Sequence, residues 1–553
     1  MKSRLNAILC MIAMVIISLP ATLSAQLSTG GVPCSFSLSI APDTNIYRAD
    51  EPVSVDKLTV EDNQSPVPYR FAVNLPVNLG IEQGQWQRTA GGTKVWRLSI
   101  KSPGALGLIL YFDRYHVPEG GKVFVYNPKR TQLLGAFTSI NNNNLSTFAT
   151  GLIYGDALTI EYNAPEDLSM PELHISELGH AYRGVSGDDR TPAGFGSSGP
   201  CEVNVNCTEG TNWQKEIRSV ARIMVKRGSS SLWCTGSLVN NTRNDGKPYL
   251  ITADHCGKSA TATDLSQWVF AFNYQGSGCK DPANEPPLKS ISGATLIAHG
   301  GDAGNTGSDF FLVLLSSAIP ASYNVYFNGW TRETTPASAS GTSIHHPQGD
   351  IKKISTYTSL LTPSHWVGNP ALSHWRVTWT GTPNGHGTTE GGSSGSPLFD
   401  SQGRLVGTLT GGDSSCDSMS LNLPDYYGMF SYHWDQNGTD SASVLKYWLD
   451  PNNTDVMTLN GWALSVPETA QNDWLTLFPN PVMDKLNIGV SLSCTKFLQV
   501  TIHDLFGNKR YEMRWNGTMT QNRQVDLSGF AAGMYLVTID DGDRFFVRKI
   551  IKQ

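Results

Sequence analysis

The stretch GGSSGSPLF at residues 391–399 places Ser394 in a tight, glycine-flanked turn directly before an apolar run. Gly392 and Gly395 allow the backbone to fold sharply and to approach another group closely, because they carry no Cβ. The N–H groups of Gly392 and Ser394 can then point together at a developing oxyanion. The turn therefore favours a nucleophilic serine with its own oxyanion hole.

A histidine that could serve this serine lies upstream, in the segment ITADHCG at residues 251–257. A serine cannot attack an amide at neutral pH without a base to take its proton, and histidine suits that task. His255 follows a short apolar run and precedes Cys256, so a disulfide could hold it rigidly. The histidine and the serine together indicate nucleophilic catalysis.

A carboxylate between them should hold the tautomer of the imidazole and stabilise the imidazolium. Asp309 in GSDFFLVLL (residues 307–315) lies at the start of an apolar run long enough for a buried strand. A carboxylate there would be partly desolvated beside the histidine. Asp302 in GGDAG (residues 300–304) is the competitor, but no apolar strand follows it directly. We therefore expect Asp309 in this role.

The order His255, Asp309, Ser394 resembles that of the chymotrypsin-fold serine peptidases. The chain is more closely similar to the bacterial lysyl endopeptidases of that superfamily. The matching segments are CTGSLVNNT (234–242), DHCG (254–257), IHHP (344–347), GSSGSP (392–397), GGDSSC (411–416) and DYYG (425–428). The resemblance implies a trypsin-like double β-barrel over residues 201–461 and hydrolysis of peptide bonds through an acyl-enzyme.

Length and composition favour several β-rich domains. A chain of 553 residues is too long for one ordinary core and predicts about three domains. Only 16% of the residues are charged, while Gly reaches 54 and Pro 30, as expected of loop-rich extracellular β domains. A net charge of −6 gives no reason to expect nucleic-acid binding.

The N-terminus predicts export. Lys2 and Arg4 precede an apolar stretch at residues 7–19, and the small-residue site LSA at 23–25 follows. This pattern is typical of a cleaved secretory signal over residues 1–25. A membrane anchor is the alternative, but the apolar run is short for one. No later segment is long and apolar enough, so we expect no transmembrane segment in the mature protein.

Eight cysteines remain after the signal, in a compartment where pairing is the default. Cys34 and Cys494 lie outside the central region, and spacing alone leaves about fifteen pairings for the other six. The resemblance to the lysyl endopeptidases implies the pairs Cys201–Cys416, Cys207–Cys279 and Cys234–Cys256. Cys201 and Cys207 are too loosely spaced for a metal site, and no histidine pair accompanies them. We therefore expect neither a metal nor another cofactor.

The segment 26–187 is predicted to be a separate β-sandwich. Strand-like stretches such as VWRLSI (95–100) and LILYF (108–112) alternate with turns. The segment fits either a substrate-binding module or a pro-domain, and we favour the pro-domain because a peptidase must stay inactive during export. The polar, glycine-rich residues 188–200 then form a linker open to proteolysis, in which Arg190 is the only basic residue.

A second linker is expected at 462–473. Residues 474–553 resemble the C-terminal sorting domain of the type IX secretion system of Bacteroidetes. The matching segments are LFPNP (477–481), VTIHDLFG (500–507), DLS (526–528), GMYLV (533–537) and RKIIK (548–552). The period-2 strands predict an Ig-like β-sandwich; a carbohydrate-binding sandwich is the alternative, but no aromatic platform stands out. The resemblance implies export through the Sec pathway and the type IX machinery, with release or attachment at the cell surface.

The residue six positions before the serine, where trypsin-like enzymes carry the acid of the primary pocket, is Thr388. The lysyl endopeptidases place the acid after the serine, and Asp425 matches that position. A buried carboxylate facing a Lys or Arg side chain would gain a charge-assisted hydrogen bond. Glu390 is the second candidate, or a helper.

Trp366 matches a tryptophan that shields the triad in the lysyl endopeptidases. Its usual histidine partner is replaced by Thr410.

Two functions of different classes follow. The first is a secreted serine endopeptidase that acts on proteins or peptides and cleaves after basic residues, with Lys favoured and Arg possible. The second is a catalytically silent, protease-like surface module used for binding. The intact set of His255, Asp309 and Ser394 favours the first.

Overall fold

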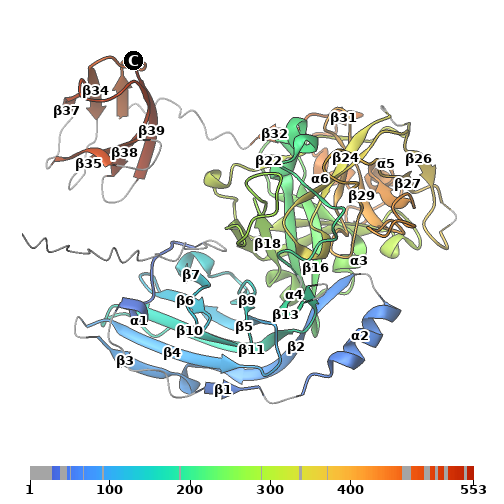
Figure 1. The fold of residues 1–553 in the computed structure, drawn as a ribbon, viewed down its shortest axis with the longest axis horizontal. Helices are drawn as coiled ribbons and strands as arrows, with labels where there is room; N and C mark the ends of the chain where they lie inside the picture. Colours follow the sequence, from blue (N-terminus) through green and yellow to red (C-terminus); the bar gives the residue numbers. More distant parts are fainter. Residues whose placement is uncertain are drawn as a thin grey trace, which may run out of the picture. The chain divides into compact units, whose positions relative to one another are not determined.

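The computed structural model describes residues 28–37, 46–49, 52–65, 68–89, 92–185, 188–192, 194–287, 289–335, 339–369, 371–463, 475–490, 498–504, 509–515, 521–540 and 545–553. The expected signal and Cys494 lie outside these ranges. The chain divides into two compact units, Met1–Leu464 and Ser465–Gln553, which we describe separately. The mostly β fold is confirmed (Figure 1). Within the described ranges, no helix has the length and apolar character needed to cross a membrane.

The N-terminal domain is a two-layer β-sandwich (Figure 1). One layer contains β1 (Ile46–Arg48), β3 (Gln85–Arg88), β4 (Lys94–Lys101), β6 (Lys122–Tyr126), β7 (Leu133–Phe137) and β10 (Ala157–Ala164). The other contains β2 (Tyr69–Leu79), β5 (Gly107–His116), β8 (Phe148–Ala149), β9 (Ile153–Tyr154) and β11 (Glu172–Ala181). Two short helices, α1 (Cys34–Ser37) and α2 (Val55–Gln64), precede β2.

Strand β5 is buried on both faces. Because side chains alternate along a strand, Leu108, Leu110 and Phe112 enter the core of the sandwich. Ile109 and Tyr111 point the other way and join a cluster that includes Trp233 of the central domain. The sandwich therefore has a second apolar face.

The strands between Val203 and Leu459 form two curled, barrel-like sheets, and we call this part of the first unit the central domain. In the first, pairing runs in the order β19, β18, β15, β16, β17, β21, β20. Its strands are β15 (Val220–Arg227), β16 (Ser230–Leu238), β17 (Tyr249–Thr252), β18 (Val269–Phe272), β19 (Lys289–Ser292), β20 (Ala294–Gly300) and β21 (Phe310–Leu315). Strand β16 also pairs with β2, so one layer of the N-terminal domain and the first sheet of the central domain form a single continuous β-sheet.

The second sheet follows the order β14, β25, β24, β28, β29, β30, β27, β26, and β23 and β31 pair at its side. These strands are β14 (Val203–Asn204), β23 (Trp330–Thr331), β24 (Gly341–His345), β25 (Lys353–Tyr357), β26 (Thr362–Ser364), β27 (His374–Val377), β28 (Pro397–Asp400), β29 (Leu405–Gly412), β30 (Asp425–Met429) and β31 (Thr458–Leu459). A core that includes Ile251, Leu312, Ile344 and Phe399 joins the two sheets. The remaining pair is β22 (Tyr326–Phe327) with β32 (Trp462–Ala463), and the α-helices are α3 (Asp254–Gly257), α4 (Ala262–Ser266), α5 (Phe430–Asp435) and α6 (Lys446–Leu449).

The segment expected to be an irregular linker is partly ordered. Within 188–200, β13 (Asp188–Pro192) pairs with β12 (Gly184–Val185). Further along, the N–H of Gly196 donates to Oδ1 of Asp350 over 2.7 Å. Backbone pairing therefore orders residues 188–192, and the hydrogen bond to Asp350 holds Gly196, in a segment that composition predicts to be a linker.

The second unit is a small β-sandwich, as expected. One layer contains β33 (Leu475–Phe478), β34 (Lys485–Val490) and β37 (Gln521–Asp526). The other contains β35 (Leu498–Asp504), β36 (Lys509–Trp515), β38 (Gly533–Asp540) and β39 (Phe545–Lys552). Ile488, Val500 and Val537 belong to its buried core.

Candidate active site

His255 lies in α3, one turn after β17 ends. Burial of β17 and the disulfide Cys234–Cys256 fix this turn against β16. The ring nitrogen Nδ1 of His255 lies 2.8 Å from Oδ2 of Asp309, and the backbone N–H of His255 donates to Oδ1 over 2.9 Å. The carboxylate therefore holds both the ring and the backbone of His255.

Asp309 is fully buried and directly precedes β21. Burial favours the neutral acid, but the His255 ring and its hydrogen bonds outweigh burial and lower the pKa of Asp309 below its usual value. The φ angle of Asp309 is +57°, a left-handed conformation that Asp adopts more readily than most residues. Asp302, the alternative, ion-pairs with Lys258 at an exposed position. The structure thus brings Asp309, and not Asp302, to the histidine.

Ser394 lies in the turn before β28. Gly392 and Gly395 have φ angles of +96° and +81°, so both use the conformational freedom that the sequence suggested. A Cβ on Gly395 would lie 2.1 Å from Oγ1 of Thr252, which leaves room only for glycine. Among the described residues, no acceptor takes the N–H groups of Gly392 and Ser394. Both are available to an oxyanion.

The second ring nitrogen of His255, Nε2, is buried without a hydrogen-bond partner among the described residues. The hydroxyl of Ser394 therefore makes no hydrogen bond to it in this conformation. Such contacts are often loose in an empty site and tighten when substrate is bound.

Asp425, the first residue of β30, is fully buried. Its Oδ2 accepts hydrogen bonds from Nε1 of Trp379 (2.6 Å), Oγ of Ser414 (2.7 Å) and Oγ1 of Thr389 (2.8 Å). Burial raises the pKa of Asp425 to about 6, and these donors limit the rise. Sequence reasoning missed Trp379 and Thr389, since nothing in their local pattern marks them.

Among the described residues, the carboxylate of Glu390 shares no hydrogen-bond partner with that of Asp425. Both of its carboxylate oxygens accept from the N–H of Gly199 at 3.1 Å, and Oε2 also accepts from Nε2 of Gln348 at 3.3 Å. Burial raises the pKa of Glu390. Its contacts fit an anchor for the segment before Cys201 better than a second pocket acid.

Trp366 is half-buried and stacks on His374, with ring centroids 6.1 Å apart and planes at 30°. Nε2 of His374 lies 3.0 Å from Oγ1 of Thr410. Burial lowers the pKa of His374 to about 4, so the ring is neutral near pH 7. His374, a residue of β27 that sequence reasoning missed, therefore packs against Trp366. It also contacts Thr410, the residue that replaces the usual histidine partner of this tryptophan.

The described residues contain three disulfides, the same pairs that the resemblance implies: Cys201–Cys416, Cys207–Cys279 and Cys234–Cys256. Cys34 forms no disulfide with any described cysteine. Glu202 and Glu390 lie near Sγ of Cys416, but that sulfur is in a disulfide and offers no thiolate for a metal.

Residues 195–428 match the family described as lysyl endopeptidase, C-terminal domain. This part of the chain is therefore similar to the lysyl endopeptidases. Residues 476–553 match the secretion system C-terminal sorting domain. The lysyl endopeptidase of Pseudomonas aeruginosa strain PAO1 is 31% identical over 294 residues, which cover 51% of this chain and 60% of that protein. The match thus spans about three fifths of the relative's length.

Solved structures also resemble parts of the chain. Protease Anisep from Arthrobacter nicotinovorans is 18% identical and has a TM-score of 0.28; the match covers 38% of this chain and 90% of that one. A Glu endopeptidase in complex with MPD is 17% identical and has a TM-score of 0.26; the match covers 43% of this chain and 94% of that one. Because both TM-scores are below 0.5, we draw no conclusion from these two structures.

Proposed function

We propose that this protein is an exported serine endopeptidase that cleaves peptide bonds after basic residues, with Lys favoured over Arg. The observation that carries the proposal is the pair formed by His255 and the buried Asp309, 2.8 Å apart, together with the glycine-flanked Ser394. The match to the lysyl endopeptidase family over residues 195–428 supports it.

In the proposed reaction, Oγ of Ser394 attacks the carbonyl carbon of the scissile bond, and Nε2 of His255 takes the hydroxyl proton. The N–H groups of Gly392 and Ser394 stabilise the oxyanion. His255 then gives its proton to the amine as the C–N bond breaks, which leaves an acyl ester on Ser394. Water, deprotonated by His255, hydrolyses the ester and restores the serine.

Asp425 is proposed to select the residue before the scissile bond. Its carboxylate is ionised above about pH 6 and fully buried. A substrate ammonium or guanidinium would therefore gain a strong charge-assisted hydrogen bond there. A flexible ammonium approaches a single carboxylate more easily than a planar guanidinium does, which favours Lys.

The flanking domains are proposed to serve export and latency. The match over residues 476–553 supports export through the type IX machinery, with that machinery as a partner. We propose that the N-terminal domain is a pro-domain, removed by cleavage in the 188–200 region. Arg190 is the only basic residue there, so a strictly Lys-specific enzyme would need another protease for that cut.

The test separates this proposal from a silent binding module. A fluorophosphonate probe should label the processed protein, and Ser394→Ala should abolish labelling. Ser277→Ala, at an exposed serine outside the site, is the matched control and should label normally. Failure of the processed wild type to label would leave the binding module as the better account.

A further inference from the structure

The loop of Ser394 is already shaped while the chain between the two domains is continuous. Nδ1 of His345 lies 2.8 Å from Oγ of Ser393, the N–H of Gln348 donates to the carbonyl of Gly391 over 2.6 Å, and the N–H of Thr235 donates to the carbonyl of Ser394 over 2.8 Å. These contacts do not involve a new chain terminus. The proposed latency of the uncut chain therefore does not require an unformed Ser394 loop and is better explained by blocked access.

Strand β2 offers such a block, because it adds to the edge of β16 beside the site. The strands are antiparallel, with Tyr69 opposite Trp233 and Val73 opposite Ser230. Trp233 precedes Cys234, whose disulfide to Cys256 adjoins His255. The paired edge thus ends at the candidate base.

The N-to-C direction of β2 along β16 matches the direction in which we expect a substrate to run. Pro68, directly before β2, lines one surface pocket together with His255 and Lys258. From there β2 leads away from the site in the N-to-C direction along β16. Because the proposed Asp425 pocket belongs to the second sheet and takes the residue before the scissile bond, we place the half of a substrate that follows that bond along the first sheet, in the same direction as β2. Extended peptides bind sheet edges in this way.

Tyr69 closes the space beside the loop of Ser394. A Cβ built on Gly391 would lie 2.4 Å from Cδ2 of Tyr69, so the ring rests directly on that glycine. The Tyr69 hydroxyl donates to Oε1 of Gln348 over 3.4 Å, and the guanidinium of Arg183 lies 4.2 Å from the centroid of the ring. Tyr69 therefore bridges the two domains at the site.

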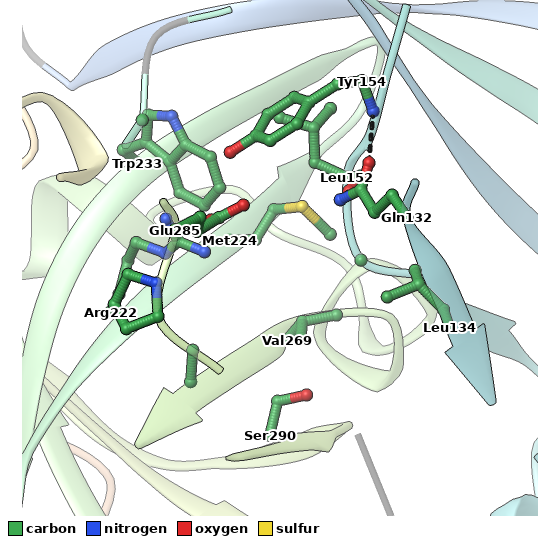
Figure 2. A pocket seen from close by; sticks show the side chains of 14 residues that line it. Gln132, Leu134, Leu152, Tyr154, Arg222, Met224, Trp233, Val269, Glu285 and Ser290 are labelled. Atoms are coloured by element: carbon green, nitrogen blue, oxygen red, sulfur yellow. Dashed lines mark hydrogen bonds between the residues drawn. The ribbon is translucent and has the colours of Figure 1, made fainter. Parts of the chain in front are cut away.

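Behind the strand pair, the domains share an apolar cluster. Phe71 stacks on Trp233 with centroids 4.2 Å apart and planes at 9°. The next part of the interface is a cavity of about 50 Å³. Leu152 and Tyr154 of the N-terminal domain line it together with Met224 of the central domain (Figure 2). Such burial resembles a domain core and does not depend on an intact linker.

We propose that the N-terminal domain is a strand-donating inhibitor: β2 occupies the place of the leaving half of a polypeptide substrate along β16 and blocks it until the cut N-terminal domain dissociates. This inference rests on the proposed endopeptidase function.

The test uses the full chain with Arg190→Gln to slow self-cleavage, its intact mass checked. Two substrates are compared: a Lys anilide that ends at the cleaved bond, and a Lys peptide that continues four residues beyond it. Tyr69→Ala should raise kcat/KM for the longer peptide by about tenfold or more, the size expected when a buried aromatic anchor is removed. Tyr69→Phe keeps the ring on Gly391 and should stay latent.

Tyr47→Ala, in β1 of the same domain, is the matched control and should change neither substrate's kcat/KM. Equal activity of Tyr69→Ala and its parent, or an equal gain in Tyr47→Ala, would overturn the proposal. Absence of both cleavage and fluorophosphonate labelling in all variants would instead refute the endopeptidase function.

If Tyr69→Ala does not fold, the double variant Val73→Cys/Ser230→Cys replaces it, because these residues lie directly opposite each other. Once the linker is cut and the protein diluted, the oxidised form should remain inactive on the longer peptide. Mild reduction should raise kcat/KM about tenfold or more, while wild type ignores the reductant. Equal activity of the two forms would contradict a strand-donating inhibitor.

Discussion

The two sheets of the central domain differ in what lies beside them. The first sheet positions His255 and Asp309, and its strand β16 continues into the N-terminal domain through β2. The second sheet holds Asp425, and all of its described strands come from residues 203–459. The pocket side is thus built by the central domain alone, whereas the side of the base is open to control by a neighbour. Access and specificity should therefore vary independently.

The largest expected effect lies on the side of the first sheet. Asp309→Asn should keep the fold and lower kcat by about 10⁴, because the amide supports the wrong tautomer of the histidine. Asp302→Asn, which alters only the exposed pair with Lys258, is the control. Kinetics with a Lys anilide on processed protein measure both. A large loss in Asp302→Asn with little loss in Asp309→Asn would show that the carboxylate is misassigned.

A change on the side of the second sheet should alter preference and leave the triad intact. Asp425→Asn should lower kcat/KM for a Lys substrate by about 10²–10³, the cost of leaving a buried charge unpaired. The isosteric neutral norleucine substrate should change little, since it makes no ion pair. A panel of Lys, Arg, norleucine and Glu substrates checks the change. Wild-type preference for an apolar or acidic residue would exclude Asp425 as the selecting group.

The disulfides should separate stability from catalysis. Removal of Cys234–Cys256 should cost about 2–4 kcal/mol of unfolding free energy and also lower kcat, because the bridge holds the His255 turn. Removal of Cys207–Cys279, which closes a loop with a sequence separation of 72, should destabilise at least as much with little change in kcat. Denaturant titration and kinetics on both double Ser variants test this. Equal losses of kcat would argue against local control of His255.

The smallest expected effect is on pH dependence. Because the pKa of Asp425 is raised to about 6, Lys substrates should lose their advantage over norleucine as the pH falls through that value. The loss should approach about tenfold for each pH unit below it. The ratio of the two kcat/KM values isolates Asp425, since the triad acts on both substrates. A ratio that stays constant down to pH 4 would contradict the raised pKa.

The raised pKa of Asp425 affects the stability of the fold in the opposite direction: activity on Lys substrates rises with pH, whereas the contribution to unfolding free energy falls. A pKa raised above 3.8 means that the folded protein binds the Asp425 proton more tightly than the unfolded chain does. This contribution is complete below 3.8 and is lost as the pH rises through about 6. Asp425→Asn should therefore flatten the fall in unfolding free energy over that window, measured against wild type by denaturant titration.

The sequence by itself was enough to predict the glycine-flanked Ser394 and the β-rich class, because these depend on local geometry and on period-2 patterns. The apolar run after Asp309 also marked that residue as the partner of His255, although the two lie 54 positions apart. The resemblance to the lysyl endopeptidases added the cysteine pairs. Glu390, four residues before Ser394, is the second candidate for the pocket acid or a helper, and its side chain hydrogen-bonds with Gly199 and Gln348. Spacing along the chain does not determine which way a buried side chain turns.

Only the tertiary structure decided what surrounds these residues. Trp379, Thr389 and Ser414 converge on Asp425 from separate segments, and His374 reaches Trp366 from another strand. The pairing of β2 with β16 joins residues more than 150 positions apart, and it uses backbone groups that every residue carries. Composition therefore holds no signal for it. The sequence predicted two domains with a linker between them. Only the tertiary structure shows that β2 of the first pairs with the edge of β16 in the second, so that the two domains share one sheet.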